Sequence, residues 1–495
     1  MPGKITKNTL FLTAAYVGQK LFSFVYFSLI ARFIGVEKVG LYVTALSFSS
    51  LFSVFADLGL TQVLIREGAR DKEKLSKILS HTIIIKLFLT LAAYVILNLL
   101  VYLMGYQEEL RQLVWISGIL MILDALTLSF YGVLRSLENL RYEAIGVIVG
   151  QIIIVLFGLL VILFKLPVVF LLISLGAGSL FNLIFSFIVA YKKGIKIVFV
   201  WQKDLAWLLT KLTLPFALAG VFTKVYSYID SVLLSYLAGT KNVGFYSIPN
   251  KVVFAFQFIP MAFAASLYPA MSKYFMTDKE KLKWAFEKAF LYLMMISAPL
   301  AVGVFIISDI FINSIYGSAY TPSIPALRIL VFGLIFAFLD FPVGSLLNAC
   351  NKQNIQTGAM GLVMVLNIIL NLILIPVWGI NGAAFSAVIG NLSLLLIGIF
   401  WVPKIIGRFD FSFWWKNFKI LVSAFLMGLL LFKTKTILLS FFLPIGFIKI
   451  FVFLAVLIFI GVMFYFALLW ISGILNKKEI KHLLSIVRPG SYESK

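Results

Sequence analysis

The chain has 495 residues, of which 62% are hydrophobic and 13% charged, and its mean hydropathy is +1.05. Soluble domains are typically about 45–50% apolar, so this composition excludes a soluble globular protein and predicts an integral membrane protein. One cysteine, Cys350, excludes a disulfide framework and a thiolate metal site. The two histidines, His81 and His482, lie far apart in the sequence. We therefore expect neither a metal nor a cofactor.

Apolar stretches long enough to cross a hydrocarbon core of about 30 Å recur from end to end. The first is too long for the apolar region of a signal peptide, so we expect it to be retained as a helix. The expected fold class is an all-α integral membrane protein of about 14 transmembrane helices. The predicted helices cover residues 10–33, 40–64, 79–104, 113–133, 144–164, 168–190, 212–237, 244–271, 289–313, 327–349, 355–377, 380–402, 418–441 and 445–472.

The net charge of +22 raises the question of a nucleic-acid partner. The distribution of charge argues against one, because most of the 42 lysines and arginines fall on one side of the predicted membrane. Cytoplasmic loops carry such an excess of Lys and Arg. We therefore expect a multi-pass protein of the cytoplasmic membrane with both termini cytoplasmic, in contact with membrane lipids and not with nucleic acid.

Two lysines within apolar stretches, Lys20 and Lys224, belong to a repeated pattern. An offset of 204 positions aligns the two copies without a gap. The first copy holds Lys20, Ser23, Leu29, Gly35, Val39, Gly40 and Tyr42, and the second holds Lys224, Ser227, Leu233, Gly239, Val243, Gly244 and Tyr246.

The offset places six helices in each repeat. Since six is even, both copies insert in the same orientation and are related by an axis along the membrane normal. We expect an N-terminal six-helix repeat over 1–200 and a C-terminal one over 201–410. Two additional transmembrane helices follow over 411–475, and a cytoplasmic tail over 476–495. The connection near 191–211 is the expected hinge between the repeats.

Both repeated lysines lie on polar stripes of their helices. A charge at the centre of a bilayer costs roughly 2.5 to over 10 kcal/mol, so it faces protein or water. Our first hypothesis is a central cavity in which Lys20 and Lys224 face one another, and the alternative is that each lysine pairs with a carboxylate and joins helices. Residues three and four positions apart share one face of a helix. The stripe of Lys20 contains Thr9, Thr13, Tyr16, Lys20, Ser23 and Phe27, and the stripe of Lys224 contains Thr213, Gly220, Lys224, Ser227, Ser231 and Ser235.

The predicted helices also contain four carboxylates. One hypothesis is that they couple transport to H⁺ or Na⁺, with Asp230 as the first candidate because it flanks the Lys224 stripe. The alternative is that they form ion pairs with intramembrane lysines. Lys86 lies near the inner edge, where snorkelling explains it equally well. The four carboxylates are Asp57, Asp124, Asp230 and Asp340, and the lysines are Lys20, Lys86, Lys224 and Lys251.

The predicted helix over 355–377 carries Asn367 and Asn371 one turn apart. Two hypotheses stand side by side: the amides bind sugar hydroxyls, or they bond to a neighbouring helix. Lys251 lies near the outer edge and is a further candidate for substrate binding.

Several catalytic motifs do not occur in the sequence. It lacks a phosphate-binding loop with Gly-Lys-Ser/Thr, an Asp-x-Asp pair and a His-Glu-x-x-His motif. No long loop offers room for a catalytic module. We therefore expect a transporter and not an enzyme, with no catalytic residues.

The region from Gly18 to Ala69 resembles the opening of the polysaccharide transporter family, within the multidrug/oligosaccharidyl-lipid/polysaccharide flippase superfamily. About fourteen helices in a 6+6+2 arrangement also resemble this family over essentially the whole chain. The residues that carry the resemblance are Ala31, Arg32, Gly35, Val39, Gly40, Tyr42, Asp57, Gly59, Leu60, Arg66, Glu67 and Ala69, with Ile229, Asp230, Gly239, Val243, Gly244, Tyr246, Ile259, Pro260 and Pro269 in the second half.

The resemblance implies a flippase that moves a polyprenyl-(pyro)phosphate-linked oligosaccharide from the inner to the outer leaflet, for polysaccharide or glycan assembly. It also implies that the protein works with glycosyltransferases and a polymerase. Paired lysines suit the anionic head, and hydroxyls and aromatics suit the sugars. One alternative is a multidrug cation exporter of the same superfamily, which would require acidic groups. Another is a membrane-embedded glycan polymerase, which would usually need a longer outer loop.

Overall fold

The computed structural model describes residues 2–198, 201–441 and 447–475. These residues are almost entirely helical, and no strand occurs among them. The helices are α1 (Pro2–Ile34), α2 (Val36–Asp57), α3 (Leu60–Arg70), α4 (Leu75–Leu103), α5 (Glu108–Ser136), α6 (Leu140–Leu163), α7 (Val169–Lys192), α8 (Lys203–Ala238), α9 (Thr240–Phe256), α10 (Phe258–Thr277), α11 (Lys279–Ile315), the 3-10 helix η1 (Ser318–Tyr320), α12 (Ser323–Ala349), α13 (Gln353–Trp378), α14 (Ile380–Trp401), α15 (Pro403–Ile406), α16 (Phe411–Phe441) and α17 (Phe447–Ile471).

Fourteen helical stretches in the described part are long and apolar enough to cross a membrane. They coincide one for one with the predicted stretches, from Phe11–Ile34 to Lys449–Ile471. The expected all-α membrane fold is therefore confirmed. A helix pairs its backbone N–H and C=O groups within its own segment, as a chain that crosses the hydrocarbon core must do.

The stretch predicted as one helix over 40–64 is divided into α2 and α3. Leu58 has a φ of 44° and Gly59 a φ of 83°, so both residues are left-handed, a conformation that glycine adopts without strain. The break ends α2 at Asp57 and turns its carboxylate toward α3. Its Oδ1 accepts hydrogen bonds from the backbone N–H and the hydroxyl of Thr61.

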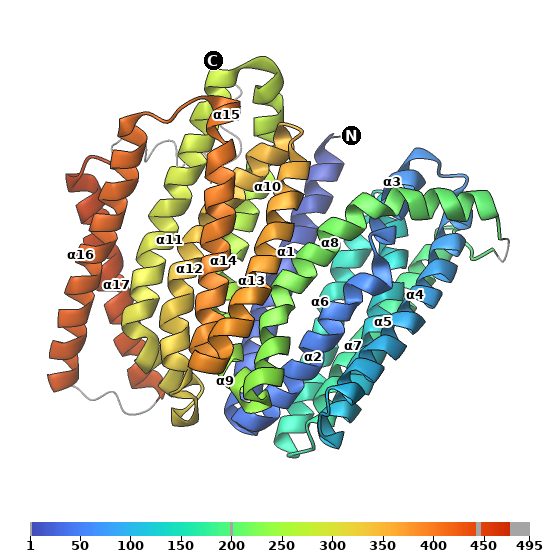
Figure 1. Ribbon diagram of the computed structural model, residues 1–495, viewed down its shortest axis with the longest axis horizontal. Helices are drawn as coiled ribbons and strands as arrows, with labels where there is room; N and C mark the ends of the chain where they lie inside the picture. Colours follow the sequence, from blue (N-terminus) through green and yellow to red (C-terminus); the bar gives the residue numbers. More distant parts are fainter. Residues whose placement is uncertain (1, 199–200, 442–446, 476–495) are drawn as a thin grey trace. The chain divides into compact units, whose positions relative to one another are not determined.

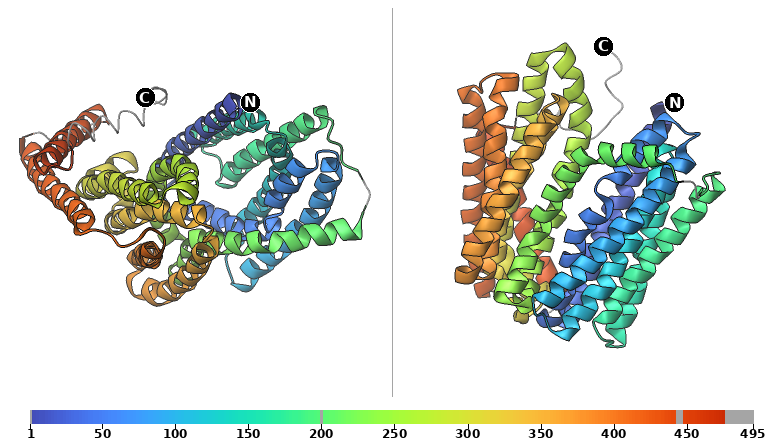
Figure 2. Two further views of the ribbon diagram at one scale, coloured as in Figure 1. Left: turned by 90° about the horizontal axis from the view of Figure 1, so that it is seen from above. Right: turned by 45° about the vertical axis from the view of Figure 1, so that its right-hand side comes forward.

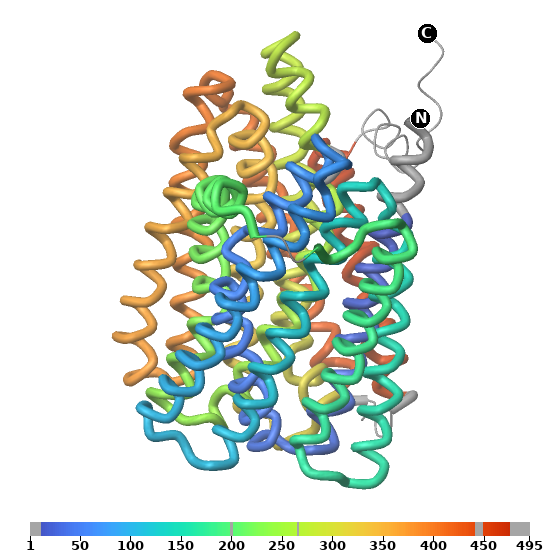
Figure 3. The backbone as a smooth tube through the Cα atoms, turned by 90° about the vertical axis from the view of Figure 1, so that its right-hand side faces the viewer, coloured from blue at the N-terminus to red at the C-terminus, as the bar shows by residue number. Residues whose placement is uncertain are grey.

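Helix α8 bends along its length. In Figure 1 its first part runs across the view before the helix turns downward, and in Figure 3 that first part is seen nearly end-on. Pro215 lies inside α8, where its ring removes one backbone hydrogen bond and favours a bend. The connection expected over 191–211 is helical from Lys203, so the predicted loop is too long. Its mixed apolar and charged residues suit a helix at the membrane surface.

By its internal packing the chain divides into two compact units. Unit 1 holds the described residues of Met1–Ala255, Ile315–Ser323 and Thr357–Gly390, and unit 2 holds those of Phe256–Ser314, Ile324–Gln356 and Asn391–Lys495. The predicted repeats over 1–200 and 201–410 concern duplication in the sequence, which packing does not test. Their boundaries stay a prediction.

Unit 1 is built around a bundle of long helices. Helix α1 packs on α6, α6 on α7, and α5 on α2, α4 and α7, while α8 packs on α2. Figure 1 and the right view of Figure 2 show these blue to teal helices running side by side. A fully buried apolar cluster that includes Val63, Leu64, Leu79 and Val133 joins α3, α4 and α5.

The segment after α11 closes one end of unit 1. The Tyr320 hydroxyl donates to the carbonyl of Ala31 over 2.9 Å, and the Arg32 guanidinium donates to the carbonyl of Ile315 over 2.9 Å. At the same end, Tyr106 and Ser235 hydroxyls lie 2.6 Å apart. Burial raises the pKa of Tyr106 to about 12, so this contact stays a neutral hydrogen bond.

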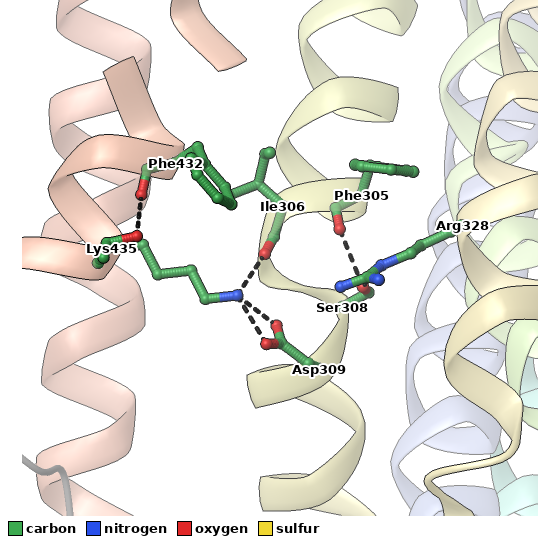
Figure 4. Close-up of polar contacts among 8 residues, drawn as sticks. Phe305, Ile306, Ser308, Asp309, Arg328, Phe432 and Lys435 are labelled. Atoms are coloured by element: carbon green, nitrogen blue, oxygen red, sulfur yellow. Dashed lines mark hydrogen bonds and ion pairs between the residues drawn. The ribbon is translucent and has the colours of Figure 1, made fainter. Parts of the chain in front are cut away.

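The two additional C-terminal helices, α16 and α17, pack on each other and belong to unit 2. Figure 4 shows how α16 is fixed to α11: the Lys435 ammonium lies 2.6 and 2.7 Å from the two oxygens of Asp309 and donates to the carbonyl of Ile306. The Tyr465 hydroxyl of α17 donates to the carbonyl of Met295 over 3.0 Å. A partly exposed ion pair and a hydrogen bond thus anchor both helices to α11.

Candidate functional site

A polar cavity of about 750 Å³ lies within unit 1. Helices α1, α2, α3, α5, α6, α7 and α8 all contribute side chains to its wall. Most of its polar groups are hydroxyls and amides, and only three lining residues carry a formal charge. The polar lining residues are Tyr16, Gln19, Ser49, Ser50, Ser53, Asp57, Gln62, Ser117, Asp124, Thr127, Tyr131, Gln151, Ser179, Asn182 and Lys224.

Asp57 on this wall is compensated by Lys86. The Lys86 ammonium forms an ion pair with Asp57 and donates to the Thr61 hydroxyl over 2.8 Å and to the carbonyl of Ala125 over 3.0 Å. Its side chain is 0% exposed, so the expectation that Lys86 snorkels is wrong. All three of its donors have acceptors inside the bundle. The alternative that we gave for the carboxylates, an ion pair with an intramembrane lysine, describes Asp57 in this structure.

A second buried charge network lies behind Tyr16. The Tyr16 hydroxyl donates to Glu143 Oε1 over 2.6 Å, and Arg135 donates to both oxygens of the same carboxylate. Glu143 is fully buried at the start of α6. Glu143 was not among the predicted site residues, because the predicted helix began at residue 144. The available signal in the sequence was an acidic residue between Arg141 and a long apolar stretch.

Asp124 and Lys224 bring opposite charges to the same cavity. Asp124 comes from α5 and Lys224 from the middle of α8. The two groups are close enough for their charges to interact, and the hydroxyl of Ser179 lies within hydrogen-bonding reach of Asp124. The Lys224 ammonium also lies 5.5 Å from the centre of the Tyr228 ring. With Asp57 compensated, the formal charges of the wall are nearly balanced.

Lys20 is not among the residues that line this cavity. Its ammonium lies 5.1 Å from the centre of the Phe254 ring on α9, while the Lys251 ammonium of α9 lies 5.3 Å from the Phe27 ring on α1. Each lysine thus sits over an aromatic ring of the other's helix, a favourable cation–π contact. The structure therefore joins Lys20 with Lys251 at the contact of α1 and α9, and places Lys224 in the cavity.

The two repeated serines lie beside the lysines. Ser227 is exposed and donates to the carbonyl of Thr223 over 2.7 Å within α8, while Ser23 is half-buried on α1. Neither lines the cavity of unit 1. The side chain of Thr9, from the first predicted stripe, lies outside the described residues.

Asp230 is part of a buried polar cluster with Asn367 and Asn371. The Asn371 amide donates to Asp230 Oδ1 over 2.7 Å, and the Tyr246 hydroxyl donates to Oδ2 over 3.2 Å. Both asparagines are 0% exposed, and the Oδ1 atom of Asn371 has no hydrogen-bond partner. Asn367 and Asn371 therefore bond to a neighbouring helix, which was one of our two hypotheses. Their contact with Asp230, which lies 141 positions from Asn371, was not predicted.

Asp340 belongs to unit 2. It lines a separate cavity of about 370 Å³ between α10, α12 and the start of α13. No group of three or more His, Cys, Asp or Glu side chains that would hold a metal ion occurs in the described ranges.

Comparison with known proteins places this arrangement in a family. Residues 5–275 match the family model described as polysaccharide biosynthesis protein, and residues 215–373 match the MatE model. A membrane protein of Methanocaldococcus jannaschii is 26% identical over 398 residues, which are 74% of this chain and 78% of that protein. The putative O-antigen transporter of Shigella flexneri is 24% identical over 408 residues, which are 77% of this chain and 94% of the transporter.

Among solved structures, the lipid II flippase MurJ in its inward closed conformation has a similar fold. The TM-score is 0.76 at 18% identity, over 93% of this chain and 98% of MurJ. The first family model alone covers more than half of the 495 residues. The chain therefore belongs to the polysaccharide biosynthesis protein family.

Proposed function

We propose that the protein is a flippase that carries a polyprenyl-(pyro)phosphate-linked oligosaccharide from the inner to the outer leaflet of the cytoplasmic membrane. The observation that carries this proposal is the cavity of unit 1, with its many hydroxyls and amides and a single lysine, Lys224. Hydroxyl and amide groups both donate and accept hydrogen bonds, as sugars require. A lysine ammonium is a compact point charge that binds phosphate. The names of relatives, such as the O-antigen transporter, support the same substrate class.

Three lysines are available for the anionic head of the substrate. Among the described residues no carboxylate forms a salt bridge of 4 Å or less with Lys20, Lys224 or Lys251. A phosphate or diphosphate would replace the aromatic contacts of Lys20 and Lys251 with charge-assisted hydrogen bonds, which are stronger. Ser23 and Ser227, one turn from the repeated lysines, would add hydroxyl donors.

The balance of charge separates this proposal from a multidrug cation exporter. A cationic drug needs an uncompensated acid, and Asp57 on the cavity wall is already paired with Lys86. Asp124 has Lys224 as a nearby cation. The wall therefore suits a neutral glycan with an anionic head better than a cation.

Transport is proposed to be secondary, driven by H⁺, Na⁺ or the membrane potential, because the sequence holds no nucleotide-binding motif. Asp230 remains the first candidate for coupling. Its carboxylate is 8% exposed and has amide and phenol donors but, among the described residues, no cationic partner. A group of this kind exchanges an ion when its surroundings change between two states. Asp57, Asp124 and Asp340 are the other candidates.

The proposed setting follows from the distribution of charge. Both termini are placed in the cytoplasm, and the substrate is supplied by glycosyltransferases on that side. A polymerase or a further transferase would take the glycan over on the outer side.

The test is flipping of a fluorescent polyprenyl-diphosphate-linked disaccharide in proteoliposomes that contain the purified protein. Lys224→Ala should lower the rate about tenfold or more, the usual effect of losing one charged hydrogen bond, and Lys224→Arg should retain more activity. Lys433→Ala, at an exposed lysine of α16, is the matched control and should flip at the wild-type rate. Wild-type activity in a Lys20→Ala/Lys224→Ala double variant would overturn the assignment of the phosphate site.

A further inference from the structure

The cavity of unit 2 has a different chemistry from that of unit 1. Its volume is about 370 Å³, and its polar lining residues are Tyr268 of α10, Asp340, Ser345 and Asn348 of α12, and Gln356 of α13. No lysine or arginine lines it. The carboxylate of Asp340 therefore has no counter-ion among the groups that form the wall.

Asp340 is placed to receive a ligand. Its Oδ1 atom is inaccessible to solvent and has no hydrogen-bond partner, while the Gln356 amide lies within hydrogen-bonding reach of the carboxylate. An unsatisfied charged oxygen in a membrane segment is costly. Because Oδ1 is closed to solvent in this structure, rotation of the Asp340 side chain would bring it to a donor in the cavity. Asn348 lies two turns beyond Asp340 on the same face of α12, which aligns both side chains with the cavity.

Gly344 keeps the space between these two side chains open. A Cβ atom at this position would lie 3.3 Å from the Gln356 Nε2 atom, closer than most such contacts. Any larger residue would therefore press on the amide that faces Asp340. The glycine preserves the room for a ligand along the α12 wall.

The chemistry of the lining selects among ligands. A phosphate would be repelled by Asp340, and nothing in the wall compensates its charge. A dehydrated ion occupies a space comparable to one water, about 30 Å³, whereas the cavity is far larger. Its volume falls within the range of about 300–1,000 Å³ for small-molecule sites. The amides and the carboxylate can bond to the hydroxyls of a sugar, and the aromatic ring of Tyr268 can pack on its apolar face.

We propose that this cavity binds one uncharged sugar residue of the transported glycan, with Asp340 accepting hydrogen bonds from sugar hydroxyls and Asn348 and Gln356 completing the contacts. The proposal rests on the proposed function and extends it: the glycan has a binding site of its own in unit 2, separate from the lysines assigned to phosphate. It also changes the expected role of Asp340 from ion coupling to sugar recognition.

The single cysteine of the chain makes a direct test possible. In a Cys350→Ala background, Ser345→Cys places the only thiol in this cavity, and its rate of modification by a methanethiosulfonate reagent reports occupancy. Free glucose, galactose and N-acetylglucosamine are the probes, with glucose 1-phosphate as the anionic comparison. We expect at least one neutral sugar to slow modification severalfold, and the sugar phosphate to protect less.

Two added substitutions test the mechanism. Asp340→Asn should raise the sugar concentration needed for protection about tenfold, because a charged acceptor is lost. Gly344→Ala should weaken protection by a smaller factor, because its Cβ atom would displace the Gln356 amide while leaving the carboxylate in place. Ser53→Cys in the same background reports the unit 1 cavity and should keep its own response to sugars in both variants.

The outcomes separate the two proposals. Protection by NaCl relative to choline chloride, without protection by any sugar, would establish a cation site and overturn the sugar site. Absence of protection in a protein that flips lipid-linked glycan would also overturn the sugar site, and would leave the flippase standing. Protection by sugar in a protein without flipping activity would support the site and contradict the flippase.

Discussion

Gly40 and Gly244 make reciprocal contacts at the starts of α2 and α9. A Cβ atom at Gly40 would collide with the carbonyl of Thr240, and one at Gly244 would collide with the carbonyl of Val36. Residues 36 and 240, like 40 and 244, are 204 positions apart. Each helix start therefore approaches the other through positions that the 204-residue offset aligns.

This contact predicts that alanine is not tolerated at either glycine. Gly40→Ala and Gly244→Ala should each lower stability by about 1–3 kcal/mol, since backbone carbonyls cannot move as side chains do. Thermal unfolding of the detergent-purified protein measures the effect. Gly18→Ala, where a Cβ atom meets nothing within 4 Å, is the control and should be neutral or stabilising. Equal behaviour of all three variants would remove the contact as an explanation.

The ion pair of Asp57 and Lys86 predicts a large loss of stability when only one of the two charges is removed. Lys86→Met should destabilise the protein by at most about 3–5 kcal/mol, the cost of breaking a fully buried pair, because the Asp57 carboxylate, 22% exposed, is left without its cation. The double variant Asp57→Asn/Lys86→Met should recover most of that loss. Thermal unfolding again provides the measurement. If the double variant is as unstable as the single one, Lys86 stabilises the bundle through packing and hydrogen bonds to Thr61 and Ala125 instead of through charge.

Asp230 is predicted to carry coupling. Asp230→Asn keeps the shape of the side chain and its contacts with Asn371, but removes the charge. Flipping in proteoliposomes should then lose most of its response to an imposed Na⁺, H⁺ or voltage gradient, while substrate binding changes less. Asp410→Asn, at a side chain that is 75% exposed, serves as the control. A wild-type rate that ignores every gradient would show a passive scramblase, in which Asp230 is structural.

The predicted topology can be checked with the same single-cysteine background. In Cys350→Ala, the Lys241→Cys thiol at the start of α9 should react with a membrane-impermeant maleimide in intact cells. The Lys279→Cys thiol at the start of α11 should react only after permeabilisation. Both positions are exposed. The reverse pattern would place the termini outside and invert the proposed direction of transport.

The number and approximate bounds of the membrane helices could be predicted from the sequence. Those follow from the lengths of apolar stretches, which are local properties set by the thickness of a bilayer. The prediction of one helix over 40–64 missed the break between α2 and α3, although Gly59 permits the left-handed turn that ends α2 at Asp57. The repeated lysines marked polar faces, because helical periodicity fixes which side chains share a face.

Which of those faces meet depends on how the helices pack, and this could not be predicted. Periodicity carries no information on the partner helix, so the pairing of Asp57 with Lys86, and of Asp230 with Asn371, could not be derived. Lys86 looked like a residue near the membrane edge, but the packing of α2, α4 and α5 gave its ammonium three acceptors inside the bundle. The same packing put Lys224 in the polar cavity of unit 1 and brought Lys20 to Phe254, because contacts between distant segments determine the surroundings of a buried charge.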